Sequence, residues 1–270
     1  MNGAGIVLCV TGTKSARGRR ADYAALTRQA IIDTARTLFA AKGFFATTVE
    51  DIATGARVAP ATVYAVGGGK HGLLRTLMDQ WQNAPIIQAT YEHIATLGDG
   101  ETILRATASG TRQVREQWGD VIRMVLATAP HDPRVAESLA AATGNYRQGM
   151  ALTAQRLADI GALKPDLSVA AATDVLWFYF GYSSYFTLTD ENGWTLAEAE
   201  KWLLAQASSA LLPTAALRPI RRAARREKYA AIRRDAGSGM TQRAIMSRHH
   251  VGRRTIAPAL ASAHPQHAHA

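Results

Sequence analysis

Residues 47–70 read TTVEDIATGARVAPATVYAVGGGK, and this stretch predicts two short helices joined by a tight turn. The first helix is expected to start at Thr47-Thr48, with Asp51 placed to favour its positively charged end. Pro60 suits the first turn of the second helix, because the missing N–H of proline has no helical partner there. That second helix is expected to end at the glycines of residues 67–69.

A longer helix is predicted to precede this pair. From Leu26 onward, apolar side chains recur at helical spacing, and the pattern stops at Lys42-Gly43, where glycine can take the left-handed conformation that ends helices. Two short helices with a longer one packed across them form the helix-turn-helix arrangement, whose last helix lies in the major groove of DNA.

The rest of the chain also favours helices. Between residues 71 and 213 helical patterning continues, with breaks near Pro85, 98–100, 130–133, 161–165 and 192–193. Segments 168–189 and 195–212 are the longest, and the second opens with a capping-box spacing from Thr195 to Glu198. No strand pattern stands out, so the sequence predicts an all-α protein with a helical bundle in its middle region.

Charge is distributed unevenly along the chain. The net charge of +10 divides into +3 for residues 1–22, +2 for 23–70, −5 for 71–213 and +10 for 214–270. Basic ends suit contact with a polyanion, because lysine and arginine gain affinity by releasing the counterions of phosphates. The same charge also fits solvated tails, so charge alone leaves both interpretations open.

Length and composition narrow the class of protein. The chain has 270 residues, 47% of them hydrophobic, which is enough for a sizeable core. Its longest apolar runs, such as 175–180, are far shorter than the ~20 residues that span a bilayer, so no membrane contact is expected. The single cysteine, Cys9, cannot form an intramolecular disulfide and suits the cytoplasm.

These patterns divide the chain into six parts. They are a basic flexible arm (1–22), a helix-turn-helix DNA-binding domain (23–70), a helical ligand-binding and dimerisation domain (71–213), a basic linker (214–226), a second helix-turn-helix, intact or degenerate (227–262), and a tail (263–270).

Residues 31–74 resemble the TetR family of bacterial regulators. Segment 174–186, followed by Gly193-Trp194 and 199–207, looks like the paired C-terminal helices through which that family dimerises. The resemblance therefore implies a homodimer formed through segments 168–189 and 195–212. The matching residues of the N-terminal stretch are Ala35, Leu38, Phe39, Gly43, Phe44, Thr47, Thr48, Val49, Asp51, Ile52, Ala53, Ala56, Val58, Thr62, Val63, Tyr64, Lys70 and Leu74.

The resemblance also implies a set of DNA contacts. They are Thr48 (or Thr47) and Lys70 with phosphates, Pro60, Ala61, Thr62 and Tyr64 with the major groove or its backbone, and Arg19 and Arg20 with the backbone or a minor groove.

Three residues depart from the family pattern. Arg57 stands where the turn usually has glycine, so a positive φ is expected there. Ala59 cannot cap the helix that follows it. Gly67 replaces the usual large aromatic and is expected to leave that packing space empty.

A second, weaker motif lies at residues 227–261. It resembles the small helix-turn-helix modules of insertion-sequence transposases and resolvases, through 239–245 (GMTQRAI) and 251–256 (VGRRTI). By analogy Arg253, Arg254 and Thr255 would meet DNA. His250 at the usual turn glycine and Pro258 inside the last helix oppose this interpretation. The segment is therefore either a second DNA reader or a poorly folded basic tail that binds phosphates without sequence preference.

Aromatic residues in the middle region suggest an effector pocket, since such pockets are mostly apolar with a few polar anchors. At helical spacing the same residues also fit an ordinary core or a dimer interface. The predicted pocket residues are Trp118, Met124, Tyr146, Trp177, Phe178 and Tyr182.

Other kinds of site find little support in the sequence. Gly67-Gly68-Gly69-Lys70 lacks the remainder of a phosphate-binding loop, and the histidines fit no closed metal site. No nucleophile motif such as G-x-S-x-G occurs, so no cofactor, metal site or enzyme activity is predicted.

The combined interpretation is a ligand-responsive transcriptional regulator. The expected partners are double-stranded DNA, carrying a palindromic operator read by a dimer, and an apolar or amphipathic small molecule that releases the protein. Repression is the usual outcome in the TetR family. Two alternatives stay open: a nonspecific or transposition-related DNA binder driven by the C-terminal module, and a small-molecule-binding protein or enzyme with an inert helix-turn-helix.

Overall fold

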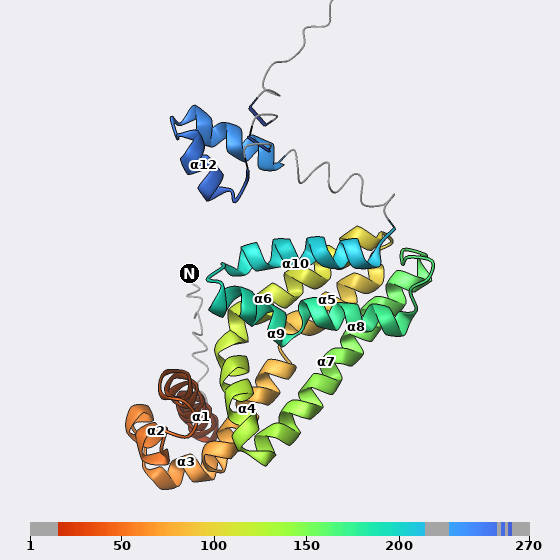
Figure 1. Cartoon of the computed structure of the whole chain (residues 1–270). Helices are drawn as coiled ribbons and strands as arrows, with labels where there is room; N and C mark the ends of the chain where they lie inside the picture. Colours follow the sequence, from red (N-terminus) through yellow and green to blue (C-terminus); the bar gives the residue numbers. More distant parts are fainter. Residues whose placement is uncertain (1–15, 214–226, 253–254, 257–258, 261–270) are drawn as a thin grey trace, which may run out of the picture.

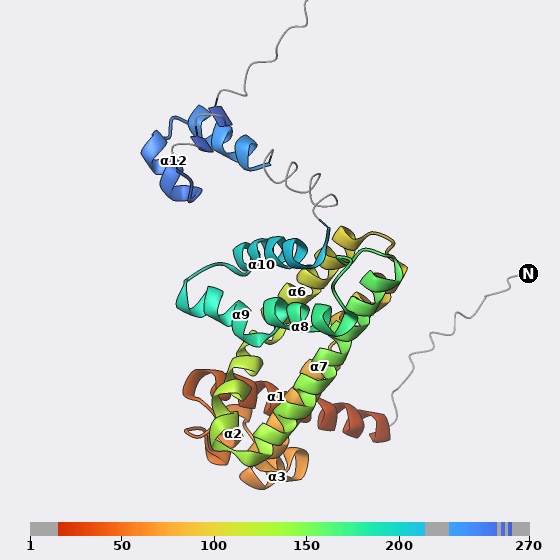
Figure 2. The ribbon, with the colours of Figure 1, turned by 45° about the vertical axis from the view of Figure 1, so that its right-hand side comes forward.

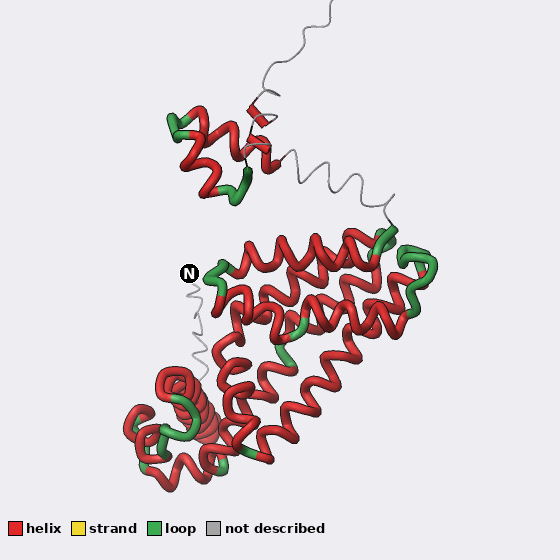
Figure 3. The backbone as a smooth tube through the Cα atoms, viewed as in Figure 1, coloured by secondary structure: helices red, strands yellow, loops and turns green. Residues whose placement is uncertain are grey.

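A computed structural model describes residues 16–213, 227–252, 255–256 and 259–260. Every regular element among these residues is a helix, as predicted (Figure 3). None of the helices in the described part of the chain combines the length and hydropathy needed to cross a bilayer. Residues 1–15, the linker 214–226 and the tail 263–270 lie outside the described residues.

The N-terminal domain contains α1 (Ala16–Lys42), α2 (Val49–Ala56), α3 (Pro60–Gly67) and the beginning of α4 (Gly69–Gln82). As predicted, α1 ends before Gly43, whose φ of 83° lies in the left-handed region. The start of α1 corrects the sequence analysis, because residues 16–22 of the predicted flexible arm are helical. Residues 16–26 are rich in alanine and arginine and contain no proline, so nothing stops the helix at residue 22.

Capping sets the limits of α2. The hydroxyl of Thr48 accepts a hydrogen bond from the Asp51 backbone N–H at 3.0 Å, and the Asp51 carboxylate accepts one from the Thr48 N–H at 3.1 Å. This capping box lowers the pKa of Asp51, chiefly through the bond from the Thr48 backbone. At the other end Arg57 has a φ of 57°, which confirms the predicted left-handed turn residue.

The join between α3 and α4 is tighter than predicted. Ala59 gives α3 no side-chain cap, as expected, and Pro60 opens the helix. Gly67, however, leaves no empty space, because a Cβ there would meet Cδ2 of Leu73 at 2.5 Å. The side chain of Leu73 from α4 therefore fills the position that a larger residue would need.

The middle region is a bundle whose elements run obliquely past one another (Figure 1). It contains α5 (Pro85–Thr96), α6 (Gly100–Thr128), η1 (Ala129–His131), α7 (Pro133–Asp159), α8 (Val169–Phe180), α9 (Tyr182–Phe186), η2 (Thr187–Glu191) and α10 (Leu196–Leu211).

Segment 168–189 is not one long helix, which corrects the sequence analysis. The chain breaks at Gly181, where a Cβ would meet the Trp177 carbonyl oxygen at 2.4 Å, so only glycine fits. The longest helices of the bundle are α6 and α7, at 29 and 27 residues. The predicted capping box at Thr195 and Glu198 is present and opens α10.

One hydrophobic cluster joins the DNA-binding domain to the bundle. Side chains of α1 and α4, such as Phe39 and Leu77, pack with Val121 and Val125 of α6 and with Val135 of α7. Figures 1 and 2 both show α1 against the end of α6. The helix-turn-helix therefore rests on the two longest helices of the bundle.

The C-terminal segment has a small core of its own. Residues 227–237 are helical, α12 spans Gln242–Arg248, and residues 255–256 and 259–260 are helical as well. The side chains of Ile232, Ile245 and Ile256 are buried together. The helix–break–helix pattern agrees with the sequence analysis, and His250, which stands at the usual turn glycine, has a positive φ of 47°. Pro258 lies outside the described residues.

Candidate DNA-binding face and effector cavity

The predicted groove-facing residues gather on α3. Pro60, Ala61 and Tyr64 are exposed, Tyr64 by 57%, and Thr62 is half-buried beside them. Val63 points inward and is fully buried, so it anchors the helix to the domain. The structure thus presents one exposed face of α3, and Thr48, at the start of the neighbouring helix α2, is exposed as well.

Thr47 cannot contact DNA, which corrects one of the two predicted phosphate-binding threonines. Its side chain is 0% exposed, and its hydroxyl donates to the Gly43 carbonyl at 2.8 Å. Thr47 therefore fixes the turn between α1 and α2. Thr48 keeps its exposed position and remains the predicted phosphate contact.

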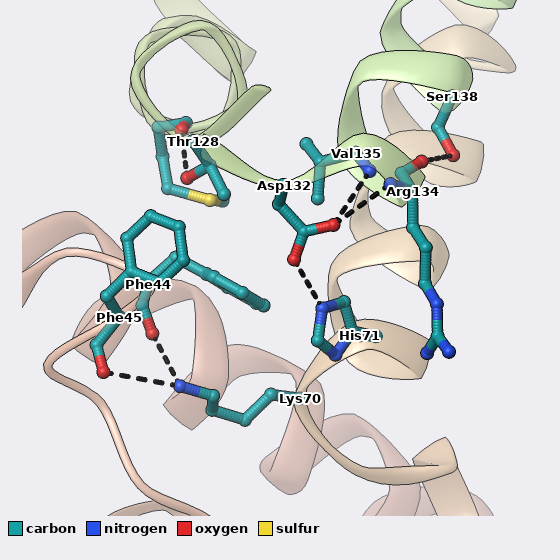
Figure 4. A network of polar contacts seen from close by, with 10 residues as sticks. Phe44, Phe45, Lys70, His71, Thr128, Asp132, Arg134, Val135 and Ser138 are labelled. Carbon is teal, nitrogen blue, oxygen red and sulfur yellow. Dashed lines mark hydrogen bonds and ion pairs between the residues drawn. The ribbon is translucent and has the colours of Figure 1, made fainter. Parts of the chain in front are cut away.

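Lys70 is already bonded within the protein. Its ammonium donates to the Phe44 carbonyl at 2.8 Å and to the Phe45 carbonyl at 3.4 Å, as Figure 4 shows. It also lies 4.7 Å from the centre of the Phe44 ring. An ammonium has three N–H donors, so one stays available for a phosphate. The phosphate contact of Lys70 remains a prediction.

The remaining predicted DNA contacts are only partly described. Arg20 is exposed on α1, and Thr255 is half-buried in the C-terminal module. The side chain of Arg19 and the residues Arg253 and Arg254 lie outside the described part of the structure.

Polar contacts of His71 and Arg36 connect the DNA-binding domain to the bundle. Nε2 of His71, on α4, lies 2.6 Å from the carboxylate of Asp132 (Figure 4), and the Arg36 guanidinium of α1 pairs with Asp120 of α6 at 2.7 Å. Asp132 also caps α7 by accepting from the Arg134 and Val135 N–H groups. The hydrogen bond from His71 lowers the pKa of the Asp132 carboxyl.

A cavity of about 230 Å³ lies inside the bundle. Its walls come from the end of α4, from α5, α6 and α7, and from α9. Most of the lining is apolar and aromatic, as is common in sites that bind small molecules. The polar lining residues include amides that are exposed and one arginine that is buried. Residues that line it include Trp81, Tyr91, Val114, Arg115, Tyr146 and Tyr182.

Two of the six predicted pocket residues line this cavity, namely Tyr146 and Tyr182. Trp177 does not line it, since it packs behind them with ring centres 5.5 and 5.4 Å away. Phe178, the next residue of α8, is 68% exposed and does not line the cavity either. These two predictions were wrong because an unbroken aromatic run does not reveal which helical face each ring occupies.

The other two predicted pocket residues belong to the junction with the DNA-binding domain. The Trp118 ring lies 4.7 Å from the Arg36 guanidinium, and Met124 is buried in the shared cluster. Both lie on α6 beyond the stretch that lines the cavity, which ends at Arg115. They are therefore corrected from pocket residues to junction residues.

Sequence reasoning missed Arg115. Its side chain is buried, with 3% exposure, and its Nη2 donates to the Phe180 carbonyl at 3.3 Å. A signal was present, because Arg115 is seven residues after Ala108 and seven before Ile122, which places all three on one helical face. The apolar partners of that face would have predicted an inward-pointing arginine.

The family of the N-terminal domain follows from comparison with known sequences. Residues 31–77 match the bacterial regulatory proteins of the tetR family. The DNA-binding domain is of the TetR family. The match covers the end of α1, the helices α2 and α3 and most of α4, in agreement with the resemblance found in the sequence. No curated protein sequence shows significant similarity to the chain.

Solved structures show that the TetR-type fold extends through the bundle. The complex of SmeT with triclosan has 18% identity and a TM-score of 0.59, and covers 71% of this chain and 94% of its own. SmeT, the repressor of the Stenotrophomonas maltophilia multidrug efflux pump SmeDEF, has 17% identity and a TM-score of 0.56. That alignment covers 70% of this chain and 92% of SmeT. The fatty acid degradation regulator FadR from Bacillus halodurans has 15% identity and a TM-score of 0.54, and the alignment covers 67% of this chain and 93% of FadR.

The match to the tetR family agrees with the class of protein predicted from the sequence. TetR-family proteins are DNA-binding transcriptional regulators and not enzymes, and the all-α architecture with an N-terminal helix-turn-helix is shared.

Proposed function

We propose that this protein is a transcriptional repressor that binds a palindromic operator as a dimer and leaves it when a small molecule fills the bundle cavity. The observation that carries the proposal is the double role of α6 and α4. Thr111 and Val114 of α6 line the cavity, and Val121 and Val125 of the same helix pack in the DNA-binding core. On α4, Trp81 likewise lines the cavity, and Leu77 packs in the DNA-binding core.

This arrangement supports a mechanical coupling between effector and DNA. A molecule that spreads α4, α5 and α6 displaces the ends of α4 and α6 on which the helix-turn-helix rests. In a dimer, such a shift changes the distance between the two α3 helices, which must match successive major grooves. Release then requires only a differential affinity of about 1–3 kcal/mol between the two states.

Dimerisation through α8 and α10 completes the proposal. Both helices pack on the bundle core, and both carry a large exposed aromatic side chain, Phe178 at 68% and Trp202 at 43% exposure. Exposed aromatic residues are enriched in protein interfaces. A second copy of the chain would cover these rings.

The first test is selection of DNA from a random pool at ~150 mM salt. The full chain is compared with a chain that ends at Pro213, which retains the helix-turn-helix and the whole bundle core. We expect both chains to enrich the same palindrome. Enrichment by the full chain alone would instead favour the second candidate function, DNA binding by the C-terminal module, which is supported by that module's separate core. If neither chain enriches a sequence, the proposal is wrong.

The link between His71 and Asp132 predicts a specific pH dependence. The folded state lowers the pKa of Asp132, so its contribution to stability is present above the ordinary carboxyl pKa of about 4 and is lost as the pH falls through the lowered value. We expect Asp132→Asn, which can still cap α7, to unfold at a lower temperature than the wild type at pH 6. That difference should close as the pH falls below about 4.

The control for this prediction is the same substitution in a His71→Ala background. Without the imidazole, the Asp132→Asn change should have a smaller effect on the unfolding temperature at pH 6. An Asp132→Asn effect that is constant from pH 6 to pH 3, or equal in the two backgrounds, would show that the contact does not stabilise the protein.

A further inference from the structure

Arg115 places a buried positive charge on the wall of the bundle cavity. Its side chain is 3% exposed and lines the cavity, and the described residues give it no ion pair with a carboxylate. Arg112, one turn earlier on α6, pairs with Glu116 at 2.5 Å and with Glu200 at 2.7 Å. The bundle thus neutralises the more exposed arginine with two carboxylates and leaves the buried one without any.

The protein compensates this charge only in part. Nη2 of Arg115 donates to the Phe180 carbonyl at the C-terminal, negative end of α8, and four aromatic rings have their centres 5.4–5.8 Å from the guanidinium. These contacts favour a cation. A guanidinium has five N–H donors, however, and the buried Nε has no acceptor among the described residues.

A second donor without a partner lies next to Arg115. The Tyr185 ring is centred 5.7 Å from the guanidinium, and its buried hydroxyl has no hydrogen-bond partner among the described residues. Burial raises the pKa of this hydroxyl, so it stays protonated and can donate. Arg115, on the wall of a mostly apolar and aromatic cavity, and Tyr185 beside it thus each keep a donor without a partner, and this pair suits a hydrogen-bond acceptor with negative charge.

We propose that the effector is a small amphipathic carboxylic acid whose carboxylate pairs with Arg115. This inference rests on the proposed function in taking the cavity as the effector site. The apolar part of the acid would lie against Trp81, Ile87, Ile94 and Val114, and Asn83 and Asn145 are exposed where the cavity meets solvent. A single arginine in a largely apolar cavity suits one negative charge with bidentate geometry better than the two charges of a phosphate monoester. Asp79 also lines the cavity, but it is exposed and solvated and opposes an anion only weakly.

The test compares acids with their neutral amides on the full-length protein. The probes are octanoic acid, 4-phenylbutyric acid and indole-3-acetic acid, each with its amide, measured by calorimetry and by thermal unfolding at 150 mM salt. We expect at least one acid to bind with a Kd below 1 mM and at least 10-fold more tightly than its amide. In Arg115→Met the acid and the amide should bind equally, and Arg115→Lys should keep part of the preference.

Stability separates a binding role from a structural one. Removing an uncompensated buried cation, with a side chain of similar length in its place, should leave the Tm of ligand-free Arg115→Met equal to or above that of the wild type. The matched control is Arg112→Met. This substitution breaks two ion pairs, and Arg112 does not line the cavity. It should lower the Tm and leave the preference for the acid unchanged.

The proposal is overturned if no acid binds at 1 mM, if amides bind as tightly as acids, if Arg115→Met keeps the preference, or if that variant loses several degrees of Tm. Because every readout is binding or unfolding without DNA, the site and the proposed function fail separately. An acid that binds through Arg115 without changing the affinity for operator DNA would refute the repressor mechanism and leave the site intact.

Discussion

Ala61→Asp is expected to lower the affinity for the selected palindrome by at least about 30-fold. Ala61 is exposed in the first turn of α3, on the face proposed to enter the major groove. A carboxylate there would meet the negative edge of the groove and its phosphates. A disrupted groove contact costs about 1–3 kcal/mol, and a dimer makes the contact twice, which gives the expected factor or more.

The same substitution should not unfold the domain. An acidic side chain in the first turn of a helix favours the positive end of its dipole, so Ala61→Asp should leave the Tm unchanged or slightly raised. Ala140→Asp is the matched control, since Ala140 is exposed on α7 and far along the chain from α3. Equal loss of affinity in both variants would show a general effect of charge. Unchanged affinity in Ala61→Asp would remove α3 from the DNA interface.

The N-terminal domain was predictable because local chemistry determines its turns. The hydroxyl of Thr48, the left-handed glycine at 43 and the ring of Pro60 each fix a helix end using only neighbouring residues. The positive φ of Arg57 could be predicted for a different reason, because the family pattern usually has glycine at that position. Within this domain, Thr47 and Thr48 could not be separated, because one hydroxyl turns into the α1–α2 turn and the other faces outward.

The cavity was less predictable because it depends on which helical faces meet. Trp177 and Phe178 are neighbours in sequence, yet one packs against Tyr146 and Tyr182 and the other is exposed. The break at Gly181 was missed as well, although it separates α8 from α9 and brings Tyr182 to the cavity. Periodicity within a segment is local information, whereas this cavity wall is assembled from residues of five helices that span positions 79 to 182.

The second large effect is expected in the salt dependence of DNA binding. Residues 214–270 hold twelve basic and two acidic residues, and five of the arginines lie in the linker, four of them clustered at 221, 222, 225 and 226. Each cation that neutralises a phosphate contributes about −0.9 to the slope of log K against log salt concentration. Replacing these four arginines by glutamine should therefore make the slope shallower by about 3–4. The affinity for random duplex DNA should fall at least about 100-fold at 50 mM salt, and much less at 500 mM.

Sequence preference should respond differently to the same change. Phosphate contacts position a protein on DNA without reading its bases, so the arginine-to-glutamine chain should still select the palindrome of the unaltered chain. Ile245→Asn disrupts the small C-terminal core and leaves all four arginines in place, so it separates charge from fold. If charge alone acts, this variant keeps the steep slope. A slope that becomes shallow only in Ile245→Asn, or a palindrome that changes with it, would show that the folded C-terminal module binds DNA as a reader, with the linker arginines contributing little.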